Sequence, residues 1–510
     1  MPSPALIPRP QQFRPRRGVI TWTSPLLVRG ELDDPVVAAF CADLERGLGL
    51  ATRPPLDTEM PQLDLRPTAT PPGGYVVEID TVTTVEAGDP EGLAAALATL
   101  RQLLPDAVYA AGGSSGPIEL PRCRITDAPR FAWRGAHLDV ARHFFDVEVV
   151  CRFIEHLGAH KFNRLHLHLN DDQGWRVELP RWPALTTVGA WRRSSPVGRI
   201  GEHADDGIPH GGFYRAEDLE RLRACAERYA ITLVPEIDLP GHAQAVVAAY
   251  PHLGCHPDGP PVEVRTEWGI STEVLAPSPA ALDFAAEVVV AVAELFPGSP
   301  VHIGGDECPT VAWEQSEVGA EAMAAHGLRE ARELQGLFTT RLAETLAERG
   351  RPCIAWDEVL DANPPPDLII AAWRHVLLGI LAARAGHRVI MAPMEFTYLD
   401  WANTEDPSEP MAILPPPFAT PWEKVYAFDP IPSELEEEFH GAILGTQAQL
   451  WTEYISTEEH LNYMAYPRLV AFSEVAWGTT TTVAHFRPRL RRHLARLEAM
   501  GIGFRPLEER

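Results

Sequence analysis

From Asp127 to about residue 490 the chain repeats one pattern, a short apolar run followed by an amphipathic stretch. In the amphipathic stretches, such as residues 328–348, apolar side chains recur at three- and four-residue steps, which is the spacing of a helix with one buried face. The strand-like runs cover residues 135–140, 162–169, 231–238, 301–305, 353–357, 368–373, 388–392 and 442–451. Eight strand-then-helix units in one run favour a parallel (β/α)8 TIM barrel over a doubly wound sheet.

The N-terminal residues 1–126 differ from the rest and read as a small α+β domain. Strand-like runs occur at 19–22, 63–65 and 75–79, and residues 93–104 have helical spacing. We therefore predict an N-terminal α+β accessory domain over 1–126, a catalytic barrel over 127–490, and a C-terminal tail over 491–510 that packs on the barrel.

The overall charge excludes two classes of partner. The formal net charge is −26, whereas nucleic acids and anionic membranes both require a basic face. No segment has the roughly 20 consecutive apolar residues of a membrane-spanning helix. We expect neither nucleic acid nor membrane as a partner, and the oligomeric state is open.

The seven cysteines are odd in number and widely scattered, and none forms a CxxC pair. This pattern is typical of reduced, mostly buried thiols in a cytosolic protein, and it favours neither a disulfide framework nor a zinc site. The first ten residues have no basic segment followed by an apolar one, as a secretory signal would. We expect a cytoplasmic protein, with secretion still open if a leader was removed.

Carboxylates and tryptophans gather where the predicted strands end, which is the end that carries the chemistry in TIM barrels. Sugars combine apolar C–H faces with a rim of hydroxyls, so flat aromatic walls and carboxylate or guanidinium groups suit them. A carboxylic acid kept protonated in such a pocket can protonate a glycosidic oxygen. The pattern therefore indicates a carbohydrate site. The segments concerned are Leu138-Asp-Val-Ala-Arg142, Asn170-Asp-Asp172, Pro235-Glu-Ile-Asp238, Gly304-Gly-Asp-Glu307, Trp356-Asp-Glu358, Trp373-Arg374, Tyr398-Leu-Asp400 and Trp451-Thr-Glu453.

The pair Asp306–Glu307 is the leading catalytic candidate because of its position. In a chain with 70 acidic residues an adjacent acidic pair alone says little, but this pair follows an apolar strand and two glycines. Two neighbouring features point to different chemistry but are incomplete. His166 and His168 are spaced like metal ligands, although no further ligand set completes a site, and Cys308 lacks an adjacent histidine that would activate it.

Long motifs in fixed order resemble the β-N-acetylhexosaminidases of glycoside hydrolase family 20. The resemblance covers roughly residues 127–478, and the N-terminal part is similar to the family's accessory α+β domain. The matching motifs include Asp127-Ala-Pro-Arg-Phe-Ala-Trp-Arg-Gly135, Asn163-Arg-Leu-His-Leu-His-Leu-Asn-Asp-Asp-Gln-Gly-Trp-Arg176, Val234-Pro-Glu-Ile-Asp-Leu-Pro-Gly-His242, His302-Ile-Gly-Gly-Asp-Glu-Cys308 and Pro467-Arg-Leu-Val-Ala-Phe-Ser-Glu474.

The resemblance implies an exo-acting hydrolase that removes terminal GlcNAc or GalNAc with retention, without cofactor or metal. In this family the substrate's own 2-acetamido oxygen attacks C1. By similarity, Glu307 is the general acid and base, Asp306 holds the acetamido N–H, and Tyr398 donates to the acetamido oxygen. Asp171 and His242 would form a relay that tunes Glu307. The resemblance further implies six substrate-binding residues: Arg142, Asp400 and Glu453 for the sugar hydroxyls, and Trp356, Trp373 and Trp451 for the walls of the pocket.

One departure and three alternatives accompany this interpretation. Tyr426-Ala-Phe-Asp-Pro430 has Phe428 where many relatives have tryptophan, which questions the affinity for the aglycone. The alternatives are release of a disaccharide such as lacto-N-biose, a metal-dependent barrel hydrolase using His166, His168, His242 and an aspartate, and a sugar-binding barrel without catalysis. The sequence does not distinguish GlcNAc from GalNAc or identify the natural oligosaccharide or glycan.

Overall fold

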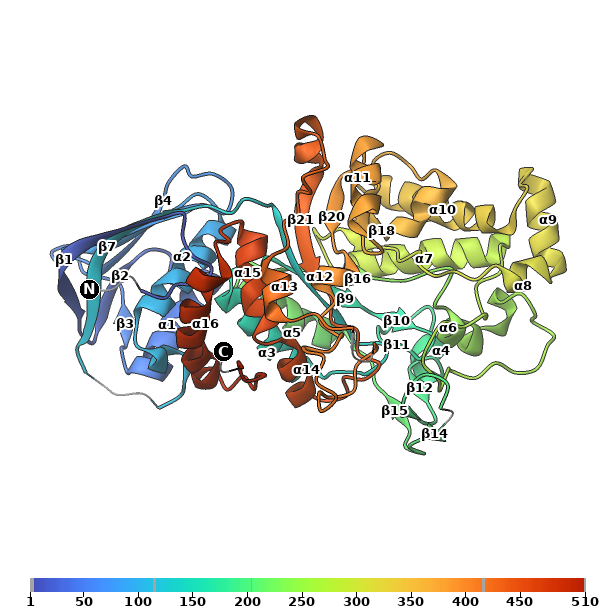
Figure 1. Cartoon of the computed structure of the whole chain (residues 1–510), viewed down its shortest axis with the longest axis horizontal. Coiled ribbons are helices and arrows are strands. Elements are labelled where there is room, and N and C mark those ends of the chain that lie inside the picture. The colour runs from blue at the N-terminus through green and yellow to red at the C-terminus, as the bar shows by residue number, and fades with distance from the viewer. Residues whose placement is uncertain (1–3, 113–115, 203, 415–417, 509–510) are drawn as a thin grey trace.

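The computed structural model describes residues 4–112, 116–202, 204–414 and 418–508. Residues 1–3 and 509–510, at the outer ends of the first and last predicted segments, lie outside this part. Seven strands form one sheet in the N-terminal domain, in the order β1-β7-β5-β6-β4-β2-β3. The strands are β1 (Gln12–Trp22), β2 (Leu26–Arg29), β3 (Thr52–Arg53), β4 (Leu63–Pro67), β5 (Tyr75–Ile79), β6 (Thr83–Ala87) and β7 (Ile118–Asp127). Helices α1 (Pro35–Leu48) and α2 (Pro90–Leu103) pack on this sheet and confirm the small α+β domain (Figure 1).

Eight parallel strands close into a barrel in the second domain, which confirms the predicted fold class. Each strand falls within, or at most two residues outside, the run that predicted it. The barrel strands are β8 (Trp133–Asp139), β9 (Arg164–His168), β16 (Thr232–Glu236), β17 (Val301–His302), β18 (Cys353–Trp356), β19 (Ile369–Ala372), β20 (Val389–Met391) and β21 (Ile443–Ala448). Strands such as β18 are buried along their whole length, which explains why they appear in the sequence as continuous apolar runs.

Helices cover the outside of the barrel. The longer ones are α3 (Val147–Ala159), α5 (Ala216–Glu227), α7 (Pro279–Leu295), α9 (Glu317–His326), α10 (Gln335–Ala347), α11 (Val376–Arg384), α14 (Glu458–Ala465) and α15 (Arg468–Trp477). Shorter ones are α4 (Ala184–Thr187), α6 (Gln244–Ala249), α8 (Val311–Glu314), α12 (Met394–Thr397) and α13 (Trp422–Tyr426). The segment between β9 and α5 contains short strands. They are β10 (Asn170–Asp171), β11 (Gly174–Trp175), β12 (Trp191–Arg192), β13 (Pro196–Val197), β14 (Ala204–Asp205) and β15 (His210–Gly211). In the described part of the chain, none of the helices has the length and apolar character needed to cross a bilayer.

The last helix, α16 (Val483–Ala499), connects the two domains. Its residues Phe486, Leu490 and Leu497 belong to the core of the barrel domain, and its Arg496 donates to the backbone oxygen of Gln102 in α2 at 2.9 Å. Figure 1 shows this helix in dark red between the N-terminal domain and the barrel. The predicted boundary at residue 490 therefore lies inside α16, which begins at Val483. The predicted C-terminal tail begins with the second half of this helix.

A buried ion pair joins the domains at the start of the barrel. Lys161, one of two lysines in the chain, lies 3.1 Å from Asp127 and donates to the hydroxyl of Tyr75 at 2.8 Å. Its ammonium also lies over the ring of Trp477, whose indole N–H donates to Asp127. These contacts satisfy the buried charges and fix the small domain against the barrel.

The prediction that all cysteines are reduced is wrong for one pair. Cys151 in α3 and Cys225 in α5 form a disulfide that closes a sequence separation of 74 residues. The two helices pack side by side, and this brings the distant cysteines together. The spacing of the cysteines in the sequence does not predict this pairing. The other five cysteines are free, and three of them are buried.

Candidate active site

A cavity of about 420 Å³ opens at the carboxyl ends of the barrel strands. Nine of the eleven residues predicted for the site line it. They are Arg142, His242, Asp306, Glu307, Trp373, Tyr398, Asp400, Trp451 and Glu453. They come from segments that follow β8, β16, β17, β19, β20 and β21, so the barrel assembles one cavity from residues more than 300 positions apart.

The backbone around Asp306 and Glu307 explains why two glycines precede them. Gly304 has a φ of 65°, and a Cβ there would lie 1.9 Å from an oxygen of Asp238. Glu307 itself has a φ of 45°, a conformation that non-glycine residues rarely adopt. Such strain concentrates at functional sites, because the surrounding structure must hold it in place. Here the sharp turn buries Asp306 but leaves the Glu307 side chain 37% exposed in the cavity.

His242 connects the acidic pair to a deeper carboxylate. Its Nε2 atom lies 3.8 Å from both Asp306 Oδ2 and Glu307 Oε2, and its Nδ1 lies 3.1 Å from Asp171 Oδ1. Burial lowers the pKa of His242, but the carboxylates of Asp171, Asp306 and Asp238 outweigh it and raise that pKa well above its ordinary value. Asp171, His242 and Glu307 thus lie in the order of the predicted relay, although His242 Nε2 makes no hydrogen bond to Glu307, and the relay itself stays a prediction. Asp171 is buried and does not line the cavity.

Asp306 lies against a second buried carboxyl, Asp238, which follows β16. Burial raises the pKa of Asp306 well above its ordinary value, and the nearby charge of Asp238 raises it further. Burial likewise raises the pKa of Asp238 to about 7, and its Oδ1 accepts from the backbone N–H of Gly305 at 2.8 Å. The two side chains interact, and the interaction raises the pKa of Asp306 and lowers that of Asp238. Asp306 Oδ1 is buried without a hydrogen-bond partner and so has an acceptor position open for a ligand N–H.

Aromatic rings form one wall of the cavity. Trp373 and Tyr398 stack with ring centroids 5.9 Å apart, and Trp451 lies next to Tyr398 at 6.5 Å. Burial raises the pKa of Tyr398 well above its ordinary value, so its hydroxyl stays protonated and can donate. The indole N–H of Trp373 donates to Glu358 at 2.9 Å, which fixes the angle of the ring.

Trp356 corrects the predicted wall. It is 1% exposed and does not line the cavity; instead its indole N–H donates to Glu236 at 2.7 Å inside the barrel. It ends β18 with its side chain directed into the barrel interior, where its ring centroid lies 6.1 Å from that of Trp451. Trp356 therefore packs behind Trp451, which lines the cavity, and is not itself part of the cavity wall.

Arg142, Asp400 and Glu453 offer polar groups away from the acidic pair. The guanidinium of Arg142 lies over the ring of Trp451, 2.7 Å from Asp171 and 3.9 Å from Glu453. Burial and the nearby Glu453 raise the pKa of Asp400 well above its ordinary value, and its Oδ1 is buried without a partner. Charged and neutral donors and acceptors thus line this end, as hydroxyl groups of a sugar require.

Several residues of the site were not among the predicted ones. Glu358 lies behind Trp373, and burial together with the charge of Asp306 raises its pKa to about 9. Asp238 pairs with Asp306 as described. Both occur in motifs visible in the sequence, Trp356-Asp-Glu358 and Pro235-Glu-Ile-Asp238, but only the fold shows what they contact. The mouth of the cavity is also more apolar than expected; it includes Ile200, Ile270, Met394, Trp401, Ile413 and Leu414.

Phe428 lies outside the cavity. It is 5% exposed and stacks on Phe396 with centroids 5.1 Å apart. The predicted effect on aglycone affinity therefore has no structural basis, because this ring does not reach the pocket.

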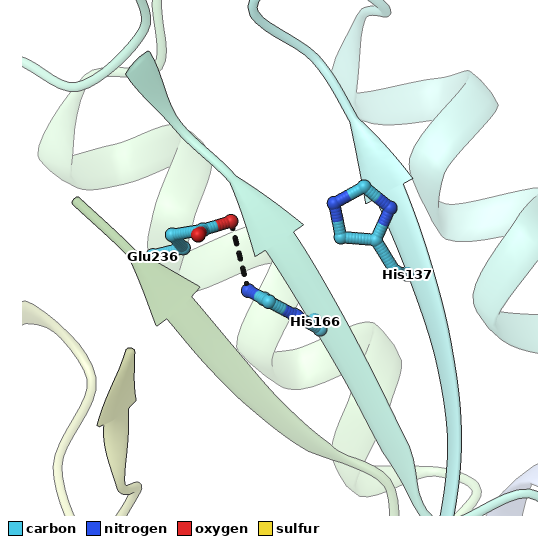
Figure 2. Close-up of side chains that lie close together, drawn as sticks. All are labelled: His137, His166 and Glu236. Atoms are coloured by element: carbon cyan, nitrogen blue, oxygen red, sulfur yellow. Dashed lines mark ion pairs between the residues drawn. The ribbon is translucent and has the colours of Figure 1, made fainter. Parts of the chain in front are cut away.

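The histidines considered as metal ligands are engaged in hydrogen bonds. Figure 2 shows His137, His166 and Glu236, whose ligand atoms lie within 4.8 Å of one another. The amide of Gln447 accepts from Trp133 through its oxygen, so its NH₂ faces Nδ1 of His166. His166 must then carry its proton on Nε2, where it meets Glu236 at 3.1 Å.

The other two histidines of that alternative are occupied in the same way. Both ring nitrogens of His168 face carboxylates, and Nδ1 of His242 faces Asp171. The three histidines offer no common position for one ion, so the donor set does not fit the metal-dependent alternative.

Comparison with known proteins agrees with both domains. Residues 131–480 match the model of the family described as "Glycosyl hydrolase family 20, catalytic domain", and residues 3–128 match "Glycosyl hydrolase family 20, domain 2". A β-hexosaminidase of Porphyromonas gingivalis is 38% identical over 416 residues, which cover 81% of this chain but only 52% of that protein. A β-hexosaminidase of Akkermansia muciniphila is 36% identical over 446 residues, or 86% of this chain and 85% of the relative.

Solved structures match over nearly the whole chain. A GH20 β-N-acetylhexosaminidase from Streptomyces coelicolor A3(2) has a TM-score of 0.85 and 30% identity, covering 100% of this chain and 99% of its own. A GH20 exo-β-N-acetylglucosaminidase from Vibrio harveyi, solved with N-acetylglucosamine, has a TM-score of 0.86 and 29% identity, covering 99% of this chain and 80% of its own.

Proposed function

This chain belongs to glycoside hydrolase family 20, and we propose that it is an exo-acting β-N-acetylhexosaminidase that hydrolyses terminal, non-reducing β-linked GlcNAc or GalNAc. The observation that carries the proposal is the open acceptor of Asp306 beside the exposed Glu307. One carboxyl is placed to hold a group on the sugar, and the other is placed to exchange a proton with the glycosidic oxygen.

The proposed reaction uses the substrate's 2-acetamido oxygen as the nucleophile. Glu307 protonates the departing oxygen, the acetamido oxygen attacks C1, and the C1–O bond to the aglycone breaks. Glu307 then removes a proton from water, which attacks C1 and reopens the bicyclic intermediate with net retention. Because the nucleophile is tethered to the reacting sugar, little entropy is lost at the attack.

Asp306 and Tyr398 would hold the acetamido group at its two ends. The free Oδ1 of Asp306 accepts the acetamido N–H, and its position favours the positive charge that develops on the ring formed in the attack. The protonated hydroxyl of Tyr398 donates to the acetamido oxygen and directs it towards C1. Trp373 and Trp451 provide flat surfaces for the acetamido group and the sugar.

Arg142, Asp400 and Glu453 would bind the hydroxyls at the far side of the ring, and this supports exo action on a chain end. A cavity of about 420 Å³ with polar groups at its inner end suits one terminal sugar, with the aglycone at the apolar mouth. Disaccharide release on the same fold is the second candidate, because the mouth adds length to the pocket.

The test compares 4-nitrophenyl β-GlcNAc, β-GalNAc, β-glucoside and β-lacto-N-bioside, with and without a chelator. Turnover of the two N-acetylhexosaminides alone, equal in chelator, supports the proposal. Turnover of the disaccharide glycoside alone supports the second candidate, and loss in chelator contradicts both.

A further inference from the structure

The interior of the barrel contains a polar cluster that the proposed reaction does not use directly. His137, His166, His168 and His302 surround Glu236, and all five are buried. They come from four neighbouring strands or strand ends, β8, β9, β16 and β17. Barrel interiors are usually filled with branched apolar residues, so this cluster requires its own explanation.

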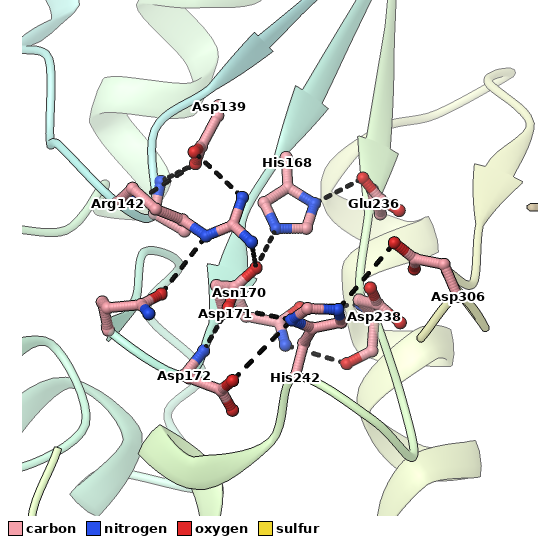
Figure 3. A network of polar contacts seen from close by, with 12 residues as sticks. Asp139, Arg142, His168, Asn170, Asp171, Asp172, Glu236, Asp238, His242 and Asp306 are labelled. Atoms are coloured by element: carbon pink, nitrogen blue, oxygen red, sulfur yellow. Dashed lines mark hydrogen bonds and ion pairs between the residues drawn. The ribbon is translucent and has the colours of Figure 1, made fainter. Parts of the chain in front are cut away.

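His168 is the member that reaches the active site (Figure 3). Its Nδ1 lies 2.5 Å from Glu236 Oε2, and its Nε2 lies 2.9 Å from Asp171 Oδ2. A carboxylate can only accept, so both nitrogens must donate and the ring is an imidazolium. The pKa of His168 agrees: burial lowers it, but Glu236 and Asp171 outweigh burial and raise it to about 10.

The remaining groups around His168 add little charge of their own. Burial lowers the pKa of His137 well below its ordinary value, and it lowers that of His166 to about 4, so both are neutral. His302 lies on the far side of Glu236, and the ring of Trp451 covers His168 edge-on at 4.9 Å. Arg142 meets the same oxygen of Asp171 as His168 does.

Asp171 is therefore held at both of its oxygens. Oδ2 accepts from His168 and lies 2.7 Å from Arg142; Oδ1 accepts from His242 and from the backbone N–H of Asp172 at 2.6 Å. With both oxygens fixed, the plane of the carboxylate sets the direction of the His242 ring. That ring in turn places Nε2 beside Glu307.

We propose that His168 is a positioning residue for the general acid: clamped between Glu236 and Asp171, it fixes the Asp171 carboxylate so that His242 is directed at Glu307. The inference adds two residues of the barrel interior, Glu236 and His168, to those that support the active site, and it rests on the proposed function. His168 contacts no substrate, and its effect on Glu307 passes through Asp171 and His242.

The variant His168→Gln tests this, because both N–H donors of an amide are on one nitrogen and its oxygen accepts, so it cannot replace the two separate donors of the imidazolium. We compare kcat/KM on two β-GlcNAc glycosides, one of 2,4-dinitrophenol, which leaves without a proton, and one of methanol, which needs one. A residue acting through Glu307 should lower kcat/KM on the methyl glycoside about tenfold more than on the dinitrophenyl glycoside. An equal loss on both substrates would overturn the proposal.

His166→Gln is the matched control. His166 lies two residues earlier on the same strand and meets the same carboxylate of Glu236, but no contact joins it to Asp171 or His242. It should lower the thermal stability of the protein without changing the ratio of the two activities. A change of that ratio as large as in His168→Gln would overturn the specific role of His168.

A measurement on the unaltered protein covers the case in which His168→Gln does not fold. In ¹⁵N-histidine-labelled protein at about pH 9, well above the ordinary imidazole pKa of about 6.5, an imidazolium signal should persist, because Glu236 and Asp171 raise the pKa of His168 to about 10. Complete loss of imidazolium signals at that pH would overturn the proposal. An unaltered protein that hydrolyses neither glycoside would instead contradict the proposed function and leave this measurement intact.

Discussion

Nε2 of His242 lies 3.8 Å from Oε2 of Glu307, while its Nδ1 meets Asp171 on the opposite side of the ring. One imidazole thus joins a solvent-facing carboxyl to a fully buried one. The φ of 45° at both His242 and Glu307 shows that the backbone at each residue is held in a rare conformation to make this contact.

Glu307→Gln should abolish proton donation and leave the pocket intact. We expect kcat/KM on 4-methylumbelliferyl β-GlcNAc to fall by about three orders of magnitude. Added azide should restore turnover of a dinitrophenyl substrate, because azide attacks C1 in place of water and, as an anion, needs no base; the C1–O bond of the bicyclic intermediate breaks and a glycosyl azide forms. No response to azide together with a small loss of activity would exclude Glu307 as the general acid and base.

Asp306→Asn should impair the enzyme on every substrate, activated or not. The amide presents a donor or a poorer acceptor to the acetamido N–H, so the nucleophile is no longer held and the developing charge is not compensated. We expect a loss of about a hundredfold or more in kcat on both dinitrophenyl and methylumbelliferyl substrates. A loss confined to the poorer leaving group would assign proton donation to Asp306 instead.

Tyr398→Phe should lower kcat while KM changes little, because its hydroxyl directs the acetamido oxygen only as attack begins. We expect a loss of about a hundredfold in kcat. Circular dichroism and thermal unfolding serve as controls, since the ring still stacks on Trp373. A rise in KM alone would limit Tyr398 to binding.

Asp238 should make the stability of the protein depend on pH. Its pKa in the folded protein, about 7, is above the ordinary value of 3.8, so the folded state holds the proton more tightly than the unfolded state. This contribution is fully present below about pH 4 and is lost as the pH rises towards 7, at up to about 1.4 kcal/mol per pH unit. Urea unfolding of Asp238→Asn across this range should show a correspondingly flatter dependence; parallel curves would contradict the shift.

The Cys151–Cys225 disulfide should contribute to stability. By closing a loop of 74 residues it lowers the entropy of the unfolded chain, so its removal should cost about 2–4 kcal/mol in the free energy of unfolding. The pair Cys151→Ala, Cys225→Ala measures this cost. Thiol counting on the denatured, unreduced protein should find five free thiols, and seven would contradict the bond.

The sequence predicted the barrel well because barrel strands carry a strong local signal. Strands such as β18 and β19 are buried on both faces, so each is an unbroken apolar run between polar segments. The helix expected over 328–348 is less regular: a short 3₁₀ turn, Ala331–Leu334, precedes α10. The side chain of Glu333 accepts from the backbone N–H groups of Arg329 and Glu330, which caps the N-terminus of this turn.

Contacts between segments that are far apart in the chain could not be predicted from the sequence. Trp356 occupies the strand end at which a wall residue was expected, but the pleat turns it inward to Glu236. Asp238 and Glu358 were visible as motif residues, yet their raised pKa values arise from burial, and for Glu358 also from the charge of Asp306. The disulfide and the position of Phe428 likewise depend on which helices and rings meet.

The central claim is that the substrate's acetamido group is the nucleophile. The most direct test measures kcat/KM on 4-nitrophenyl β-glucosaminides whose N-acyl group carries zero, one, two or three fluorines. Each fluorine makes the acyl oxygen less nucleophilic, so kcat/KM should fall steeply along the series. A flat series, or a covalent sugar adduct on Asp306 or Glu307, would contradict the account.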